Sequence, residues 1–157
     1  MKNLLKLLAS VFICLAAGGI GTLFTSSAIP TWYATLNKPV FSPPNYLFAP
    51  VWTLLYILMG VSAYLIYSKG LKSKKVRAAL YLFGIQLVLN ALWSPVFFGA
   101  KNILLALIII IAMWICIGKT ILAFGKINKV ASYLLYPYIA WVSFATILNF
   151  SVWLLNK

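Results

Sequence analysis

The chain has 157 residues, of which 64% are hydrophobic and only 8% are charged, whereas soluble domains are about half apolar and about a quarter charged. It contains no aspartate, glutamate or histidine, and its formal net charge is +13. This composition is typical of a membrane protein, and it excludes catalytic triads, paired carboxylates and histidine or carboxylate metal sites.

Five segments are apolar and long enough to cross a bilayer, which requires ~20 residues per helix. In chain order they cover residues 5–26, 50–67, 78–98, 103–122 and 131–155. We therefore predict an all-α membrane protein, a five-transmembrane-helix bundle in which residues 1–157 form a single domain. Because the connectors are short, we expect sequential helices to be antiparallel neighbours.

The first segment shares features with a secretory signal peptide, because Lys2 and Lys6 precede its apolar core. Its apolar character continues well beyond a cleavage site, so we expect it to be retained as a span. Ala17, Gly18 and Gly21 offer small surfaces that allow close helix packing.

The connector between the first and second spans is rich in both proline and aromatic residues. Four prolines prevent a regular helix there: Pro39, Pro43, Pro44 and Pro50. Five large aromatic residues accompany them: Trp32, Tyr33, Phe41, Tyr46 and Phe48. A solvated linker does not need such side chains, so we predict a lid over an apolar cavity.

Neutral polar and aromatic residues recur at helical spacing in three spans. The stripes are Trp52 and Tyr56; Gln86, Asn90 and Trp93; and Trp141, Ala145 and Asn149. Each stripe alone is typical of contacts between helices, and together they predict a binding cavity. The predicted ligand is a large, planar, apolar molecule stacked on Trp and Tyr rings and oriented by amide side chains.

Positive charges predict the orientation. Ten of the thirteen fall on the side of the N-terminus in a five-span model. The predicted N-terminus is cytoplasmic, and the lid and C-terminus are external. The cluster at residues 69–77 is also compatible with a nucleic-acid or anionic-lipid patch, but cytoplasmic anchoring explains it without a partner. We expect membrane lipid as a partner and no nucleic acid.

Cys14 and Cys116 lie in apolar runs and are expected to be buried thiols.

Three blocks of the sequence resemble the TspO/MBR family of translocator proteins. They are WYATLNKPVFSPP with PVWTLLYILMG, then QLVLNALWSPVFFGA, then LLYPYIAWVSFATILN, within residues 32–149. The resemblance implies five spans, frequent homodimers and binding of porphyrins, sterols and synthetic planar ligands. By matching position it implies a cavity lined by Tyr33, Trp52, Tyr56, Asn90, Trp93, Trp141, Ala145 and Leu148.

The resemblance favours a membrane receptor or sensor that binds porphyrin, with no cofactor required. Stacking rather than axial ligation is expected for haem, because the chain has no histidine. One alternative is a light- and oxygen-dependent porphyrin-degrading enzyme, since Trp32 and Trp141 match tryptophans proposed for that chemistry. The other is a tetrapyrrole or sterol transporter. A dedicated sterol role is weakened because Phe150 and Leu154 replace the tyrosine and arginine of the sterol-associated pattern.

Overall fold

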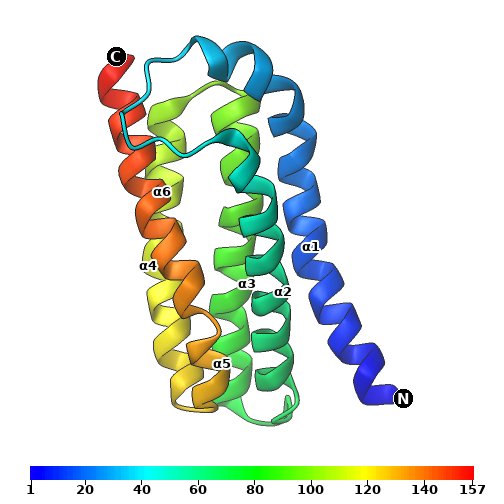
Figure 1. Ribbon diagram of the computed structural model, residues 1–157. Helices are drawn as coiled ribbons and strands as arrows, with labels where there is room; N and C mark the ends of the chain where they lie inside the picture. Colours follow the sequence, from blue (N-terminus) through cyan, green and yellow to red (C-terminus); the bar gives the residue numbers. More distant parts are fainter.

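The computed structural model describes residues 1–157, which form helices joined by short connectors. Five helical spans lie side by side as a bundle, with the two termini at opposite ends (Figure 1). Each span is long and apolar enough to cross a membrane, which confirms the predicted five-helix membrane fold. The protein is an integral, multi-pass membrane protein.

The spans extend beyond the predicted bounds at several ends. The elements are α1 (Lys2–Ala28), η1 (Ile29–Tyr33), η2 (Asn45–Leu47), α2 (Phe48–Tyr67), α3 (Lys74–Ser94), η3 (Pro95–Gly99), α4 (Ile103–Gly125), α5 (Lys129–Tyr133) and α6 (Tyr136–Leu155).

The end of the first span corrects our prediction. We expected the helix to end at residue 26 and Trp32 and Tyr33 to belong to the lid, but the helical path continues through Tyr33 as the π-helical turn η1. Pro30 lies in the first turn of η1. Proline removes one helical hydrogen bond, and a wider π turn is a common way to absorb that loss.

The last span also differs from the prediction, because it is not one continuous helix. The short helix α5 ends at Tyr133, and α6 begins at Tyr136 with Pro137 in its first turn. A proline ring clashes with the carbonyl group four residues earlier, which here belongs to Tyr133. The break therefore falls where Pro137 requires it.

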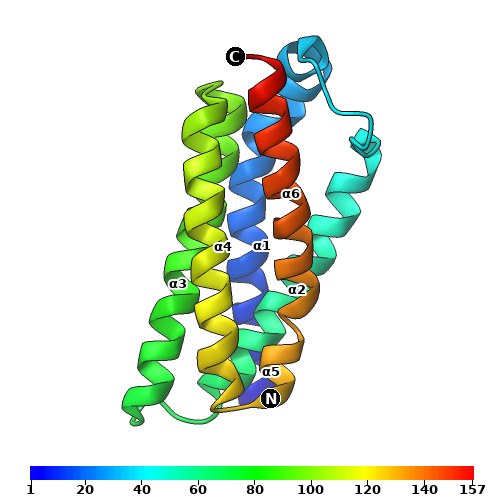
Figure 2. The same cartoon turned by 90° about the vertical axis from the view of Figure 1, so that its left-hand side faces the viewer.

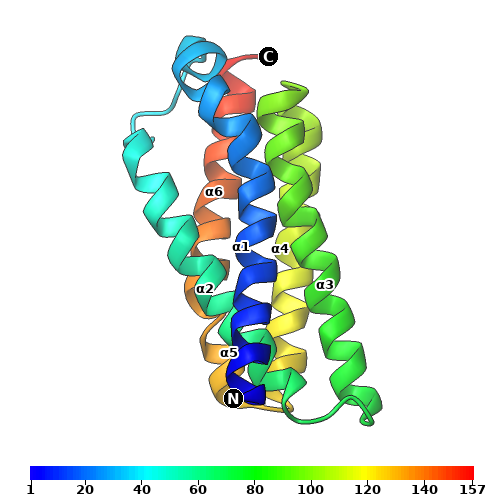
Figure 3. The ribbon, with the colours of Figure 1, turned by 90° about the vertical axis from the view of Figure 1, so that its right-hand side faces the viewer.

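The helices are not all packed in chain order. α1 lies between α2 and α3 and packs along both (Figure 3), and α4 packs against α3 and α6 (Figure 2). The prediction of sequential neighbours is right for α1 with α2, for α3 with α4 and for α4 with α6. It is wrong for much of α2 and α3, because α1 occupies the space between them. α2 contacts α6 only slightly.

Small residues allow α1 to approach its two neighbours. Ser10 Oγ donates a hydrogen bond of 2.8 Å to the carbonyl oxygen of Gly60, and a Cβ at Gly60 would clash with the backbone of Val11. On the other side, Ser94 Oγ donates to the carbonyl oxygen of Gly21 at 3.1 Å. These contacts hold α1 against both α2 and α3, and the second involves Gly21, one of the three small residues predicted to allow close packing.

Candidate functional site

A cavity of about 500 Å³ lies within the bundle, toward the end that carries the connector. All five spans contribute to its wall. Nine of the ten residues predicted to bind a ligand line it: Tyr33, Trp52, Tyr56, Asn90, Trp93, Trp141, Ala145, Leu148 and Asn149. This volume is within the usual range for sites that enclose a small organic ligand.

Aromatic rings form three parts of the cavity wall. Trp52 stacks on Tyr56, one turn further along α2, with ring centroids 5.6 Å apart and planes inclined by 27°. Trp93 of α3 stacks on Phe97 at 5.1 Å. Trp141 of α6 meets Phe48 edge-on at 6.1 Å. Aromatic pairs of these kinds present flat, apolar surfaces in fixed orientations.

Asn149 fixes the Trp93 ring. Its Oδ1 accepts a hydrogen bond of 3.0 Å from Trp93 Nε1, and its Nδ2 donates one of 3.1 Å to the carbonyl oxygen of Ile103. Both polar atoms of the amide thus have partners within the protein. Asn149 therefore positions an aromatic wall of the cavity, and it does not present a free amide to a ligand.

Polar residues in the cavity wall and beneath it form one connected chain of hydrogen bonds. Tyr56 Oη donates to Asn90 Oδ1 at 2.6 Å, Asn90 Nδ2 donates to Tyr138 Oη at 2.8 Å, and Tyr138 Oη donates to Gln86 Oε1 at 2.7 Å. The chain joins α2, α3 and α6. It pairs buried polar groups that would otherwise be costly in an apolar interior, and it leaves Gln86 Nε2 without a partner.

Gln86 corrects our prediction of the cavity wall. It shares a helical face with Asn90, but it lies one turn deeper and is not among the residues that line the cavity. Its side chain is engaged by Tyr138, a residue of α6 that our sequence analysis did not select. Asn90 lines the cavity, yet its amide is already bonded on both sides, so its ability to orient a ligand is reduced.

Trp32 lies apart from the cavity wall. Its ring packs edge-on against Phe97 at 5.8 Å, and it does not line the cavity with Trp141. Trp141 carries a buried indole nitrogen that has no hydrogen-bond partner. The two tryptophans of the enzyme hypothesis therefore occupy different environments.

Only part of the connector faces the cavity. Tyr33, Asn45 and Phe48 line it, whereas Phe41 packs on Phe144 at 6.3 Å and Tyr46 is 75% exposed. The predicted lid of five aromatic residues is thus reduced to two rings, Tyr33 at the end of η1 and Phe48 at the start of α2.

Two asparagines fasten the connector to the end of α6. The backbone N–H of Asn37 donates to Asn156 Oδ1 at 2.9 Å, and Asn156 Nδ2 donates to the carbonyl oxygen of Asn37 at 2.8 Å. Next to them, Lys38 Nζ lies 4.8 Å from the centre of the Tyr33 ring. A positive charge therefore stands beside a residue of the cavity wall.

Sequence reasoning missed the contribution of α1 to the cavity. Gly19, Thr22 and Ser26 line it and are exposed to solvent, as are Ala49 and Thr53 of α2. Here α2 leans away from the other helices toward its connector end (Figures 2 and 3). The cavity therefore has a lateral opening between α1 and α2, bordered by small side chains. The run of small residues in α1 was its only sequence signal.

Comparison with known proteins gives consistent matches over nearly the whole chain. The model of the TspO/MBR family matches residues 10–154. The tryptophan-rich protein TspO of Chlorobaculum tepidum is 44% identical over 99% of this chain and 98% of its own length. The tryptophan-rich sensory protein of Cereibacter sphaeroides is 38% identical, over 80% of this chain and 77% of its own. The human translocator protein is 38% identical, over 85% of this chain and 80% of its own.

Proposed function

The chain belongs to the TspO/MBR family of membrane sensor and binding proteins, and we propose that its cavity binds a porphyrin. The observation that carries the proposal is the set of three aromatic walls, built on Trp52, Trp93 and Trp141, around one cavity of about 500 Å³. A planar macrocycle can stack on such rings at little cost in polar desolvation.

Several polar side chains of the cavity wall are already hydrogen-bonded within the protein, which favours a ligand that needs few hydrogen bonds, and the indole N–H of Trp141 is left unpaired. The amides of Asn90 and Asn149 are both bonded within the protein, as is the indole N–H of Trp93. A sugar or nucleotide would leave many of its own polar groups unpaired in this cavity, which is costly. Shape and stacking therefore select the ligand.

Lys38 distinguishes a porphyrin from a neutral planar ligand. Its ammonium group lies beside Tyr33 in a protein that has no acidic residue to pair with it. The carboxylates of protoporphyrin supply the missing negative charge, whereas a sterol offers none. We expect the ring to occupy the cavity and a carboxylate to lie at Lys38.

The proposal is tested by titrating protoporphyrin into the purified protein and following tryptophan fluorescence. Trp52→Ala removes a stacking face and should weaken binding by ~1–3 kcal/mol, which is about 5- to 150-fold. The matched control is Trp114→Ala, because Trp114 is 43% exposed on α4 and does not line the cavity. Equal affinities of the wild type and Trp52→Ala would contradict the assigned site.

The role of the carboxylates is tested separately with the dimethyl ester of protoporphyrin. Lys38→Gln should weaken binding of the free acid and leave binding of the ester unchanged. If both ligands lose affinity equally, Lys38 acts through the connector and not through its charge.

One observation also favours the porphyrin-degrading enzyme as a second candidate. Trp141 lies in the cavity wall, where a bound macrocycle would contact it, and tryptophan is among the few redox-active side chains of this sequence. No carboxylate or imidazole that could assist proton transfer accompanies it, because the chain has no aspartate, glutamate or histidine. We therefore place binding first and oxidative chemistry second.

A further inference from the structure

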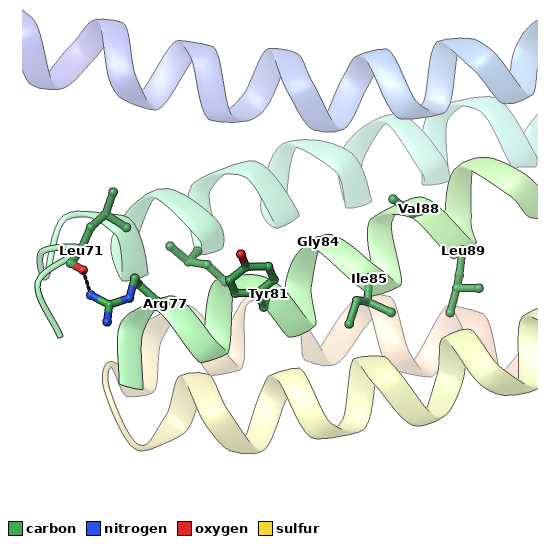
Figure 4. A pocket seen from close by; sticks show the side chains of 8 residues that line it. Leu71, Arg77, Tyr81, Gly84, Ile85, Val88 and Leu89 are labelled. Atoms are coloured by element: carbon green, nitrogen blue, oxygen red, sulfur yellow. Dashed lines mark hydrogen bonds between the residues drawn. The ribbon is translucent and has the colours of Figure 1, made fainter. Parts of the chain in front are cut away.

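A second concave surface lies outside the bundle, along the outward face of α3 (Figure 4). This groove has a volume of about 590 Å³ and runs from Leu71 and Arg77, past Gly84, to Val88. Apart from Arg77 and Gly84 it is lined by hydrophobic and tyrosine side chains. None of its residues lines the cavity described above.

Arg77 is the only arginine among the thirteen positively charged residues of the chain. Its Nη1 donates hydrogen bonds to the carbonyl oxygens of Leu71 at 2.7 Å and Lys72 at 3.2 Å. These bonds hold the guanidinium group at one end of the groove, as Figure 4 shows, and leave its other N–H groups available. A planar guanidinium with free N–H groups is well suited to a phosphate.

Gly84 forms a depression in the middle of the groove. A Cβ placed there would meet no atom within 4 Å, so the helix surface is open at this point. From Arg77 to Val88 the helix rises by roughly 16 Å, at about 1.5 Å per residue. Half of a bilayer core is about 15 Å thick, so the groove is as long as an acyl chain in one leaflet.

The positive charge of the protein is concentrated at this end. Lys69, Lys72, Lys74 and Lys75 precede Arg77 within eight residues, and the chain has no acidic side chain with which they could pair. A negatively charged lipid headgroup can neutralise such a cluster. Cytoplasmic anchoring alone explains the lysines, but it explains neither the fixed guanidinium nor the groove that starts beside it.

We propose that this groove binds one anionic phospholipid, with its phosphate on the Arg77 guanidinium and an acyl chain lying over Gly84. Charge complementarity favours a lipid over a second copy of this chain. In a symmetric dimer formed by this face, the clusters around Arg77 would approach each other without any acidic residue between them.

The test compares lipid binding by native mass spectrometry of the full-length protein in detergent. Palmitoyl-oleoyl phosphatidylglycerol and the corresponding phosphatidylcholine are titrated separately, and the wild type should retain the first about tenfold more strongly. Arg77→Gln should remove this preference, and Arg77→Lys should restore part of it. Lys75→Gln is the matched control, because it also removes one positive charge. Lys75 lies two residues before Arg77, and its side chain is exposed and does not line the groove.

Gly84→Leu tests the acyl-chain part of the groove, and it should weaken binding of both lipids while the protein remains folded. Inorganic phosphate at the same concentration should not displace phosphatidylglycerol. Equal losses in Arg77→Gln and Lys75→Gln would overturn the proposal in favour of a diffuse charge effect. Full displacement of the lipid by phosphate would also overturn the proposal. A Gly84→Leu variant that changes only the proportion of dimers would overturn it too, and would identify this face as an interface between copies of the chain.

Discussion

Tyr138 and Gln86 are joined by a hydrogen bond of 2.7 Å between α6 and α3, beneath the cavity. The same hydroxyl accepts a hydrogen bond of 2.8 Å from Asn90, and Tyr138 is fully buried. Tyr138→Phe would leave two buried amide groups without these partners. We expect the free energy of unfolding to fall by ~1–3 kcal/mol, measured by denaturation in detergent.

The matched control for this variant is Tyr136→Phe, because the Tyr136 side chain is 50% exposed and makes no hydrogen bond within the protein. It should leave stability unchanged within ~0.5 kcal/mol. Tyr138→Phe should also keep most of its porphyrin affinity, since Tyr138 does not line the cavity. Loss of affinity without loss of stability would show that the chain of hydrogen bonds serves the ligand directly.

The contact between α1 and α2 predicts a difference between two glycines. A Cβ at Gly60 would clash with the backbone of Val11, whereas a Cβ at Gly84 would meet nothing within 4 Å. Gly60→Ala must therefore separate the helices and should lower the midpoint of thermal unfolding by several degrees. Gly84→Ala should leave it equal or slightly raised. Equal midpoints for the two variants would show that α1 shifts freely along α2.

The sequence predicted most of the cavity because its residues recur at helical spacing in apolar spans. Trp52, Asn90 and Trp141 could be placed on inward faces by this rule alone. Spacing does not tell how deep a residue lies, so Gln86 was assigned to the cavity although Tyr138 binds it beneath. The lateral opening was missed because it depends on the tilt of α2 against α1, which no local pattern encodes.

The distribution of charge predicts the orientation of the protein in its membrane. Lys72 lies in the connector between α2 and α3, at the end of the bundle that also carries the N-terminus, and Lys38 lies at the opposite end (Figure 1). Most positive charges are at the first end, so reporter insertions at Lys72 should be cytoplasmic and those at Lys38 external. The reverse labelling would refute this orientation and leave the fold unaffected.

The opening between α1 and α2 predicts how an apolar ligand reaches the cavity. Gly19→Leu should narrow the opening, because Gly19 lines the cavity, is exposed, and would meet no atom with an added Cβ. Association and dissociation of protoporphyrin should both slow by about tenfold at nearly constant affinity, as measured by stopped-flow fluorescence. Gly84→Leu is the matched control, because it makes the same substitution on α3 at a residue that does not line the cavity, and it should leave both rates unchanged.

Entry beneath the connector would give a different result. Asn156→Ala removes two hydrogen bonds that hold the connector at Asn37, so it should loosen the connector without touching the lateral opening. If this variant accelerates exchange and Gly19→Leu has no effect, the ligand enters from the aqueous side.

Trp141→Phe separates binding from oxidative chemistry. Phenylalanine keeps an aromatic face in the cavity wall beside Phe48 and Phe144, so most of the porphyrin affinity should remain. It is much harder to oxidise than tryptophan, so it cannot replace Trp141 as a redox partner of the bound macrocycle. Any light- and oxygen-dependent loss of the porphyrin absorption band should therefore disappear.

Trp32→Phe should have little effect, because Trp32 lies outside the cavity wall. Degradation at the wild-type rate in Trp141→Phe and in the Trp32→Phe, Trp141→Phe double variant would exclude catalysis through these two tryptophans. An intact wild-type protein that binds porphyrin and never bleaches it under light and oxygen would establish binding without turnover.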